Sequence, residues 1–271
     1  MIRRIATLSL AGLVAASTAS AIRAQSSAST ASAVARKNAS QTAHKATIVL
    51  VHGAFTDGTG WHKVIALLQR DGYEVIAVQN PLTSFSNDIE TTRRVIDGRQ
   101  TPVVLVGHSY GGAVITEAAA SRPNVKALVY IAAFAPDANE PIGAFLEKYP
   151  NTLGPALKPD AAGFLYVDAA RFRDVFASDL SAVEVNVAAA AQKPIIGTVF
   201  GASPTQASWK TVPSFYLVTQ RDRALNPELQ RFYAKRIGAT TVESDASHAV
   251  FLSRPGVVAK LIEQAAEATA K

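Results

Sequence analysis

Residues 107–112 read Gly-His-Ser-Tyr-Gly-Gly and contain the pattern G-x-S-x-G. The apolar run 103–106 precedes them, and an apolar-periodic segment over 113–120 follows. This order predicts a strand, a sharp turn and a helix, with Ser109 at the tip of the turn. The glycines two residues to either side are needed because larger side chains would collide there. The first N–H groups of the helix would point at the serine, so the pattern favours a nucleophile.

A serine nucleophile needs a histidine base and an acid that orients the histidine. In folds that carry this turn, the acid and then the base follow the serine along the chain. Among the five histidines only His248 follows Ser109. Asp222, directly after an apolar stretch, is the predicted acid. Asp137, after an earlier apolar stretch, is the alternative acid, whereas Asp245 is too close in sequence to the histidine.

Two backbone N–H groups must stabilise the oxyanion that forms during acyl transfer. One is predicted at Tyr110, directly after the nucleophile, and the other at Ala54, in the loop after the first predicted strand. His52 opens this loop, and we assign it a structural role as a hydrogen-bonding group because it precedes Ser109. His108 is predicted to point away from the serine and to pack in the core.

These motifs resemble the α/β-hydrolase superfamily, in a bacterial branch similar to plant hydroxynitrile lyases and to methyl-ketone or salicylate esterases. The resemblance covers about residues 46–265. It implies a serine hydrolase that cleaves a carboxylic ester through an acyl-enzyme. The matching positions are His52-Gly53-Ala54-Phe55, the stretch 107–112, Asp222 with Pro227-Glu228 behind it, and His248.

Two positions depart from the plant hydroxynitrile lyases. Those lyases have a lysine directly after the catalytic histidine and a threonine in the oxyanion loop, where this chain has Ala249 and Gly53. The lysine stabilises the leaving cyanide, so its absence favours ester hydrolysis. A lyase on the same triad, or a small-ligand receptor without catalysis, are the alternatives. Ser109 excludes the haloalkane dehalogenases, whose nucleophile is an aspartate.

Apolar stretches and helical patterns alternate along the chain, which predicts an α/β fold with a mostly parallel six-stranded sheet and helices on both faces. Strands are expected near 46–51, 74–78, 102–106, 125–132, 213–219 and 240–244. Helices are expected near 60–70, 86–97, 111–121, 226–237 and 255–269.

Residues 136–210 interrupt this alternation and are predicted to form a helical cap insertion over the serine. Helices are expected at 168–177 and 179–191. Apolar walls would suit an ester with a hydrophobic acyl or alcohol part, although the same side chains could also pack the cap on the core. The candidate pocket residues are Phe55, Phe134, Phe145, Leu146, Phe164, Phe176, Phe200 and Trp209.

The N-terminus has the features of a secretory signal peptide over residues 1–24: two arginines, an apolar stretch and small residues. Cleavage is expected after Ala21 or Ala24, and the mature protein is expected in the periplasm or outside the cell. The apolar stretch is short for a membrane span. Residues 25–45, rich in Ser, Ala and Thr, are expected to be flexible, and 46–271 form the hydrolase domain.

Composition limits the class of protein. The chain has 271 residues, of which 48% are hydrophobic and 18% charged, as in a globular protein. Loss of Arg3, Arg4 and Arg23 with the leader lowers the formal charge from +6 to about +3. No basic stripe predicts nucleic-acid binding, and the absence of cysteine excludes disulfides. We expect no cofactor, no metal and a small-molecule ester as partner; the oligomeric state is not predicted.

Overall fold

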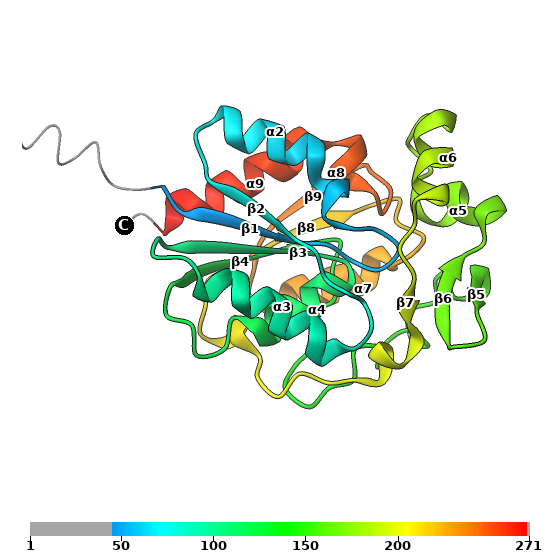
Figure 1. The fold of residues 1–271 in the computed structure, drawn as a ribbon, viewed down its shortest axis with the longest axis horizontal. Helices are drawn as coiled ribbons and strands as arrows, with labels where there is room; N and C mark the ends of the chain where they lie inside the picture. Colours follow the sequence, from blue (N-terminus) through cyan, green and yellow to red (C-terminus); the bar gives the residue numbers. More distant parts are fainter. Residues whose placement is uncertain (1–44, 270–271) are drawn as a thin grey trace, which may run out of the picture. The chain divides into compact units, whose positions relative to one another are not determined.

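The structure, a computed structural model, describes residues 45–269. The predicted signal peptide, and nearly all of the stretch 25–45, lie outside the described residues. Within 45–269, strands and helices alternate as predicted, and one insertion interrupts the series (Figure 1). No helix in this part of the chain is long and apolar enough to cross a lipid bilayer.

Six strands form the central sheet: β1 (Thr47–Val51), β2 (Val75–Val78), β3 (Val103–His108), β4 (Val125–Ile131), β8 (Ser214–Thr219) and β9 (Thr240–Ser244). Their order is β2-β1-β3-β4-β8-β9, and every neighbouring pair is parallel. Strands covered on both faces are apolar throughout rather than alternating, and β1 and β3 are buried along their whole length. The predicted six-stranded sheet is confirmed.

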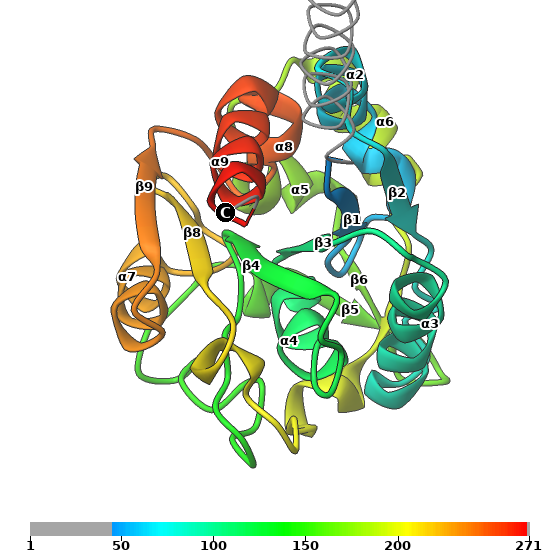
Figure 2. The same ribbon diagram turned by 90° about the vertical axis from the view of Figure 1, so that its left-hand side faces the viewer.

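Helices cover both faces of the sheet, as Figure 2 shows. One face carries α2 (His62–Arg70), α8 (Val250–Ser253) and α9 (Pro255–Ala268), and the other carries α3 (Phe85–Asp97), α4 (Tyr110–Ala118) and α7 (Pro227–Arg236). Asn226 caps α7 by accepting a hydrogen bond from the Glu228 N–H, with proline at the first helical position. A short 3₁₀ turn, η1 (Gly58–Trp61), leads into α2.

The insertion leaves the sheet after β4 and returns at β8. It contains the two expected helices, α5 (Ala169–Phe176) and α6 (Ala182–Ala190). The prediction of a purely helical insertion was incomplete, because β5 (Leu157–Pro159), β6 (Phe164–Val167) and β7 (Ile195–Ile196) form a three-stranded antiparallel sheet. These strands of two to four residues are too short to show an alternating pattern. Short 3₁₀ turns fill the remainder: η2 (Gly154–Ala156), η3 (Gly197–Gly201) and η4 (Ser208–Lys210).

The carboxyl ends of four parallel strands supply the candidate site. Ala54 follows β1, Ser109 follows β3, Asp222 follows β8 and His248 follows β9. Parallel strands end at the same edge of a sheet, so residues far apart in the sequence meet there. In Figure 1 the helices and strands of the insertion gather beyond this edge.

Candidate active site

Ser109 occupies the turn between β3 and α4 with φ 52° and ψ −122°. A positive φ is strained for a residue with a side chain, so neighbouring backbone must hold it. The Ser109 N–H donates to the carbonyl of Ile131 (3.1 Å), and the Phe134 N–H donates to the carbonyl of Ser109 (3.1 Å). The end of β4 therefore holds the turn, and the predicted sharp bend is confirmed.

Glycine is required at several places around this serine. A Cβ at Gly107 would lie 2.5 Å from the Gly111 carbonyl oxygen, and one at Gly111 would lie 2.5 Å from the Val51 carbonyl oxygen. A Cβ at Gly53 would lie 2.8 Å from the Cβ of Ser109. The loop after β1 thus touches the serine through its backbone, and a threonine at position 53 would collide with it.

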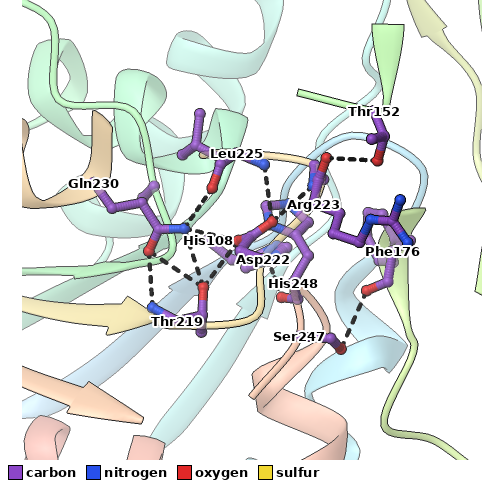
Figure 3. A network of polar contacts seen from close by, with 12 residues as sticks. His108, Thr152, Phe176, Thr219, Asp222, Arg223, Leu225, Gln230, Ser247 and His248 are labelled. Atoms are coloured by element: carbon purple, nitrogen blue, oxygen red, sulfur yellow. Dashed lines mark hydrogen bonds and ion pairs between the residues drawn. The ribbon is translucent and has the colours of Figure 1, made fainter. Parts of the chain in front are cut away.

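Asp222 and His248 form a buried pair (Figure 3). His248 Nδ1 lies 2.7 Å from Asp222 Oδ2, and their side chains are 2% and 0% exposed. An ionised carboxylate only accepts hydrogen bonds, so this contact places the imidazole proton on Nδ1 and leaves Nε2 as the free acceptor. The other carboxylate oxygen, Oδ1, accepts the N–H groups of Ala224 and Leu225, both at 2.8 Å.

Two further side chains orient the carboxylate of Asp222. Thr219 Oγ1 donates to Oδ2 at 2.9 Å, and Gln230 Nε2 donates to the same oxygen at 2.8 Å. Gln230 is fully buried; its Oε1 accepts the Thr219 N–H (2.9 Å), and its Nε2 also donates to the Leu225 carbonyl (2.7 Å). Neither residue could be predicted from the sequence, since a single threonine at the end of a strand or a single glutamine on an amphipathic helix carries no signal.

Ser109 and His248 line one cavity of about 90 Å³ beneath the insertion. No hydrogen bond joins Ser109 Oγ to His248 within residues 45–269. Catalytic hydrogen bonds are often long before a substrate is bound, so the shared cavity is the more informative observation. Ser109 and the imidazole that Asp222 orients therefore share one cavity.

Ala54 and Tyr110, the predicted oxyanion donors, line this same cavity. Across residues 45–269, neither backbone N–H is paired with an acceptor. Unpaired amides that face a cavity beside a nucleophile are available to a developing negative charge. The structure thus places all five residues of the predicted chemistry, the two amides and Ser109, Asp222 and His248, in one site.

The two buried histidines near the site have structural contacts. His52 Nδ1 lies 2.9 Å from the Gly53 carbonyl and its Nε2 accepts the Asn80 N–H (3.1 Å), which confirms the loop role. Burial lowers the pKa of His52 to about 4, so its imidazole is neutral. His108 packs as predicted, and its Nε2 also contacts the carbonyl of His248 at 3.0 Å. Burial lowers the pKa of His108 well below its ordinary value.

Asp137, the alternative acid, and Asp245 are both engaged elsewhere. Asp137 pairs with Lys210 at 2.5 Å and is partly exposed. Partial burial raises the pKa of that carboxyl, but the hydrogen bonds from Lys210 and from the Ala138 N–H outweigh it, so the pKa lies below its usual value. Asp245 pairs with Arg221 at 2.6 Å on the surface. Neither carboxylate contacts His248.

Five of the eight candidate pocket residues line the cavity: Phe55, Phe134, Leu146, Phe176 and Phe200. The other three do not line it. Phe145 packs on Phe232 with ring centroids 5.0 Å apart, Trp209 donates its indole N–H to the Pro136 carbonyl, and Phe164 lies in β6, the middle strand of the small sheet. The walls not foreseen are Asn151, Leu153, Gly154, Leu157, Ala224 and Leu225.

The lining of this cavity contains no lysine or arginine. Ala249, at the position of the lyase lysine, is buried, and its N–H donates to the Phe176 carbonyl (3.0 Å). A leaving anion such as cyanide would therefore find no side-chain cation beside Ser109.

Comparison with known proteins decides the family, because residues 48–261 match the alpha/beta hydrolase family. The chain belongs to this family. It is 29% identical over 245 residues to an alpha/beta hydrolase of Aspergillus novofumigatus, covering 82% of this chain and 97% of the relative. It is 26% identical to the polyneuridine aldehyde esterase of Rauvolfia serpentina, with 79% and 93% covered.

Among solved structures, the pyrethroid hydrolase of Sphingobium faniae is similar with a TM-score of 0.70. The two sequences are 23% identical, and the match covers 83% of this chain and 98% of that one. At this identity the likeness shows the fold. The α/β-hydrolase resemblance and the fold class predicted from the sequence are confirmed.

Proposed function

We propose that this alpha/beta hydrolase is a serine esterase that cleaves a carboxylic ester through an acyl-enzyme. The observation that carries the proposal is the buried Asp222–His248 pair, which opens onto the cavity that holds Ser109. Names of relatives add support, since a 26% identical relative is called an esterase.

In the proposed first half-reaction, Ser109 Oγ attacks the ester carbonyl carbon while His248 Nε2 takes the hydroxyl proton. The amides of Ala54 and Tyr110 hold the oxyanion, and Asp222 stabilises the imidazolium without taking its proton. The tetrahedral intermediate collapses, the C–O bond to the alcohol breaks, and His248 donates the proton to the leaving oxygen.

In the second half-reaction, water enters and His248 removes one of its protons. The resulting hydroxide attacks the acyl carbon, the bond to Ser109 Oγ breaks, and the serine recovers its proton from the imidazolium. The products are the carboxylic acid and the free enzyme. The atoms balance: the alcohol leaves with the proton of Ser109, the acid receives the hydroxyl of the water, and the other proton of the water restores the hydroxyl of Ser109.

The lyase alternative is less well supported, because the cavity lacks a cation for cyanide and an unpaired anion in an apolar site is costly. The receptor alternative is also less well supported, because ligand binding alone does not need the fully buried Asp222–His248 pair. The cavity around Ser109, with a volume of about 90 Å³, admits only small groups. We therefore expect esters with a short acyl chain as substrates, either activated or with an aromatic alcohol part.

The proposal is tested by offering the purified protein p-nitrophenyl esters and, separately, mandelonitrile. We expect ester turnover that stops on labelling with an organophosphonate, and cyanide release no faster than in buffer. Ser86, exposed on α3, provides a matched control: Ser86→Ala should label and turn over like the wild type. Label-sensitive cyanide release without ester turnover would establish the lyase, and absence of labelling would favour the receptor.

We also propose export, with residues 1–24 as the signal peptide. The support is the sequence alone: Arg3 and Arg4, the apolar stretch 5–16, and the Ala-Ser-Ala triplet at 19–21. Expression of the full chain in a Gram-negative host tests it by N-terminal sequencing. We expect the mature protein to begin at Ile22 or Gln25; an unprocessed chain confined to the cytosol would contradict export.

A further inference from the structure

A second cavity adjoins the nucleophile cavity, and the mechanism above does not use it. Its volume is about 300 Å³, against about 90 Å³ around Ser109. It lies between α6 of the insertion and the wall formed by η1, α2 and α8. An apolar protein cavity of about 150 Å³ holds a benzene molecule. The cavity at Ser109 is too small for a ring of that size, whereas the second cavity has room for two fused rings.

Phe55 and Phe176 line both cavities and form the partition between them. Phe55 is buried and has φ 63°, a conformation that bulky residues avoid. Strain of this kind persists where the surroundings impose it, and it is concentrated at ligand sites. Its backbone directly follows the Ala54 amide, so the strained residue joins the predicted oxyanion loop to the second cavity.

Two neighbours of His248 line the second cavity, although His248 itself lines the cavity of Ser109. The ring of Phe176 packs edge-on against the ring of His248, with centroids 4.9 Å apart, and Ala249 follows the histidine. Both Phe176 and Ala249 line the large cavity. His248 must give its proton to the leaving alcohol oxygen, so the alcohol part of the ester leaves beside the imidazole.

The lining of the second cavity suits an apolar group. Phe172, Leu180, Phe251 and several alanines form its walls. On α6, Val183 and Val187 also line it although they are 73% and 63% exposed, an unusual position for two neighbouring large apolar side chains. Polar groups lie in the same lining: Lys63 of α2 bonds Glu184 of α6 at 2.7 Å and the Leu252 carbonyl at 3.2 Å, which ties the two walls together.

Building on the proposed esterase function, we propose that this second cavity binds the apolar alcohol part of the substrate, an aryl or fused-ring group. The acyl part, which must be small, occupies the cavity of Ser109, and the ester bond passes between Phe55 and Phe176. The preferred substrates are then short-chain acyl esters of large aromatic alcohols rather than long-chain acyl esters of small alcohols.

The test fills the second cavity without touching the cavity of Ser109. Ala188, half-buried on α6, lines only the larger cavity, and Ala188→Trp would occupy it. Val187→Trp, at an exposed position on the same helix, does so without disturbing the core. Ala190→Trp, exposed on α6 and outside both linings, is the matched control. Circular dichroism and thermal unfolding verify that each variant is folded.

Three esters are compared: ethyl acetate, 2-naphthyl acetate and ethyl octanoate. We expect the two filling variants to lower kcat/KM for 2-naphthyl acetate by at least about tenfold, the scale on which a pocket discriminates small differences in size. For ethyl acetate the filling variants should remain within about twofold of the wild type, and Ala190→Trp should do so for all three esters.

Equal loss on both acetates, no loss on 2-naphthyl acetate, or a loss confined to ethyl octanoate would overturn the proposal. Loss in Ala190→Trp as large as in Ala188→Trp would also overturn it, because the effect would then come from the helix and not from the cavity. A failure of the esterase function itself appears differently, as a wild-type protein that hydrolyses none of the three esters.

Discussion

At the carboxyl edge of the sheet, Asp222 is buried and each of its oxygens accepts at least two hydrogen bonds, whereas the insertion faces the same site with apolar side chains. Two apolar side chains of the insertion that line the second cavity, Val183 and Val187, are largely exposed. A buried charge is tolerable only with a full set of donors, so each partner at the sheet edge is required. Apolar walls need only fill space, and several side chains can do that.

Substitutions in the two regions should therefore have different consequences. Changes at the sheet edge should remove chemistry, and changes in the insertion should alter which ester fits. The two regions nevertheless meet at the loop after β9, where Asp179 of the insertion accepts the Ser247 N–H at 3.0 Å and Phe176 accepts the Ala249 N–H at 3.0 Å. The insertion therefore also holds the segment that carries His248.

The largest effect is expected at Ser109. Ser109→Ala removes the nucleophile and should lower kcat by about 10⁶ on p-nitrophenyl acetate, with unfolding unchanged. Trp209→Phe is the contrasting change in the insertion, since Trp209 lies outside the cavity, and it should retain kcat within about twofold. A Ser109→Ala enzyme with more than about a tenth of wild-type kcat would place the nucleophile elsewhere.

Asp222→Asn is expected to have the second-largest effect on activity. The amide cannot stabilise the imidazolium or fix its tautomer, so kcat should fall by about 10⁴. Asp137→Asn, at a carboxylate paired with Lys210, serves as control and should change kcat little. Steady-state rates of the two variants decide which aspartate is the acid. A larger loss in Asp137→Asn than in Asp222→Asn would place the acid in the segment after β4.

Low pH should destabilise the folded protein through His52. Its pKa in the folded state is about 4, below the unfolded value of about 6.5, so only the unfolded chain takes up a proton between these values. Its contribution to stability is complete above pH 6.5, falls as the pH drops toward 4, and then levels off. The total is roughly 3 kcal/mol.

Urea unfolding at a series of pH values measures this loss. His52→Gln, which cannot titrate, should have a flatter profile over the same range than the wild type. His62→Gln, on the exposed start of α2, is the matched change and should leave the profile as it is. Identical slopes in the wild type and His52→Gln would show that other groups cause the acid sensitivity.

Of the four residues tested by substitution, Gln230 should have the smallest effect. Gln230→Leu removes one donor to Asp222, so the carboxylate is held less firmly, and kcat should fall about tenfold with KM nearly unchanged. The less stabilised carboxylate should bind the imidazolium more strongly, which would move the acid limb of the kcat–pH profile to higher pH. Gln220→Leu, exposed beside Glu243, is the control.

Loss of stability in Gln230→Leu without a shift of the acid limb would mean that Gln230 only supports the fold. Both quantities come from the same preparation, since thermal unfolding reports the fold and the kcat–pH profile reports the carboxylate. A positioning role requires the shift.

The sequence predicted the central sheet, and it also named the residues that the structure brings together at the candidate site. Long buried strands such as β3 have a strong apolar signal, and glycines on both sides of a serine directly after such a strand are typical of this sharp turn. Asp222 and His248 could be found because the chain order of the fold restricts where they lie. The same order excluded His52, whose contacts in the structure are structural.

The insertion and the polar support of Asp222 could not be predicted. β7 has two residues, and no periodicity can be read from so short a strand. The sequence does not distinguish Phe145, Phe164 and Trp209 from Phe134 and Phe176. Only the packing of the folded chain determines which of these aromatic side chains faces the cavity. Thr219 and Gln230 are eleven residues apart on different elements, and only the folded chain brings them to one carboxylate.

β4 and β8, the strands between which the insertion runs, are neighbours in the sheet, with Leu128 opposite Ser214. The insertion therefore begins and ends at adjacent strands, and its length does not alter the register of any strand pair. The entropy of closing such an insertion grows only with the logarithm of its length. Evolution can lengthen, shorten or exchange this segment at little expense to folding, so substrate preference can diverge among descendants while the hydrolytic apparatus is inherited intact.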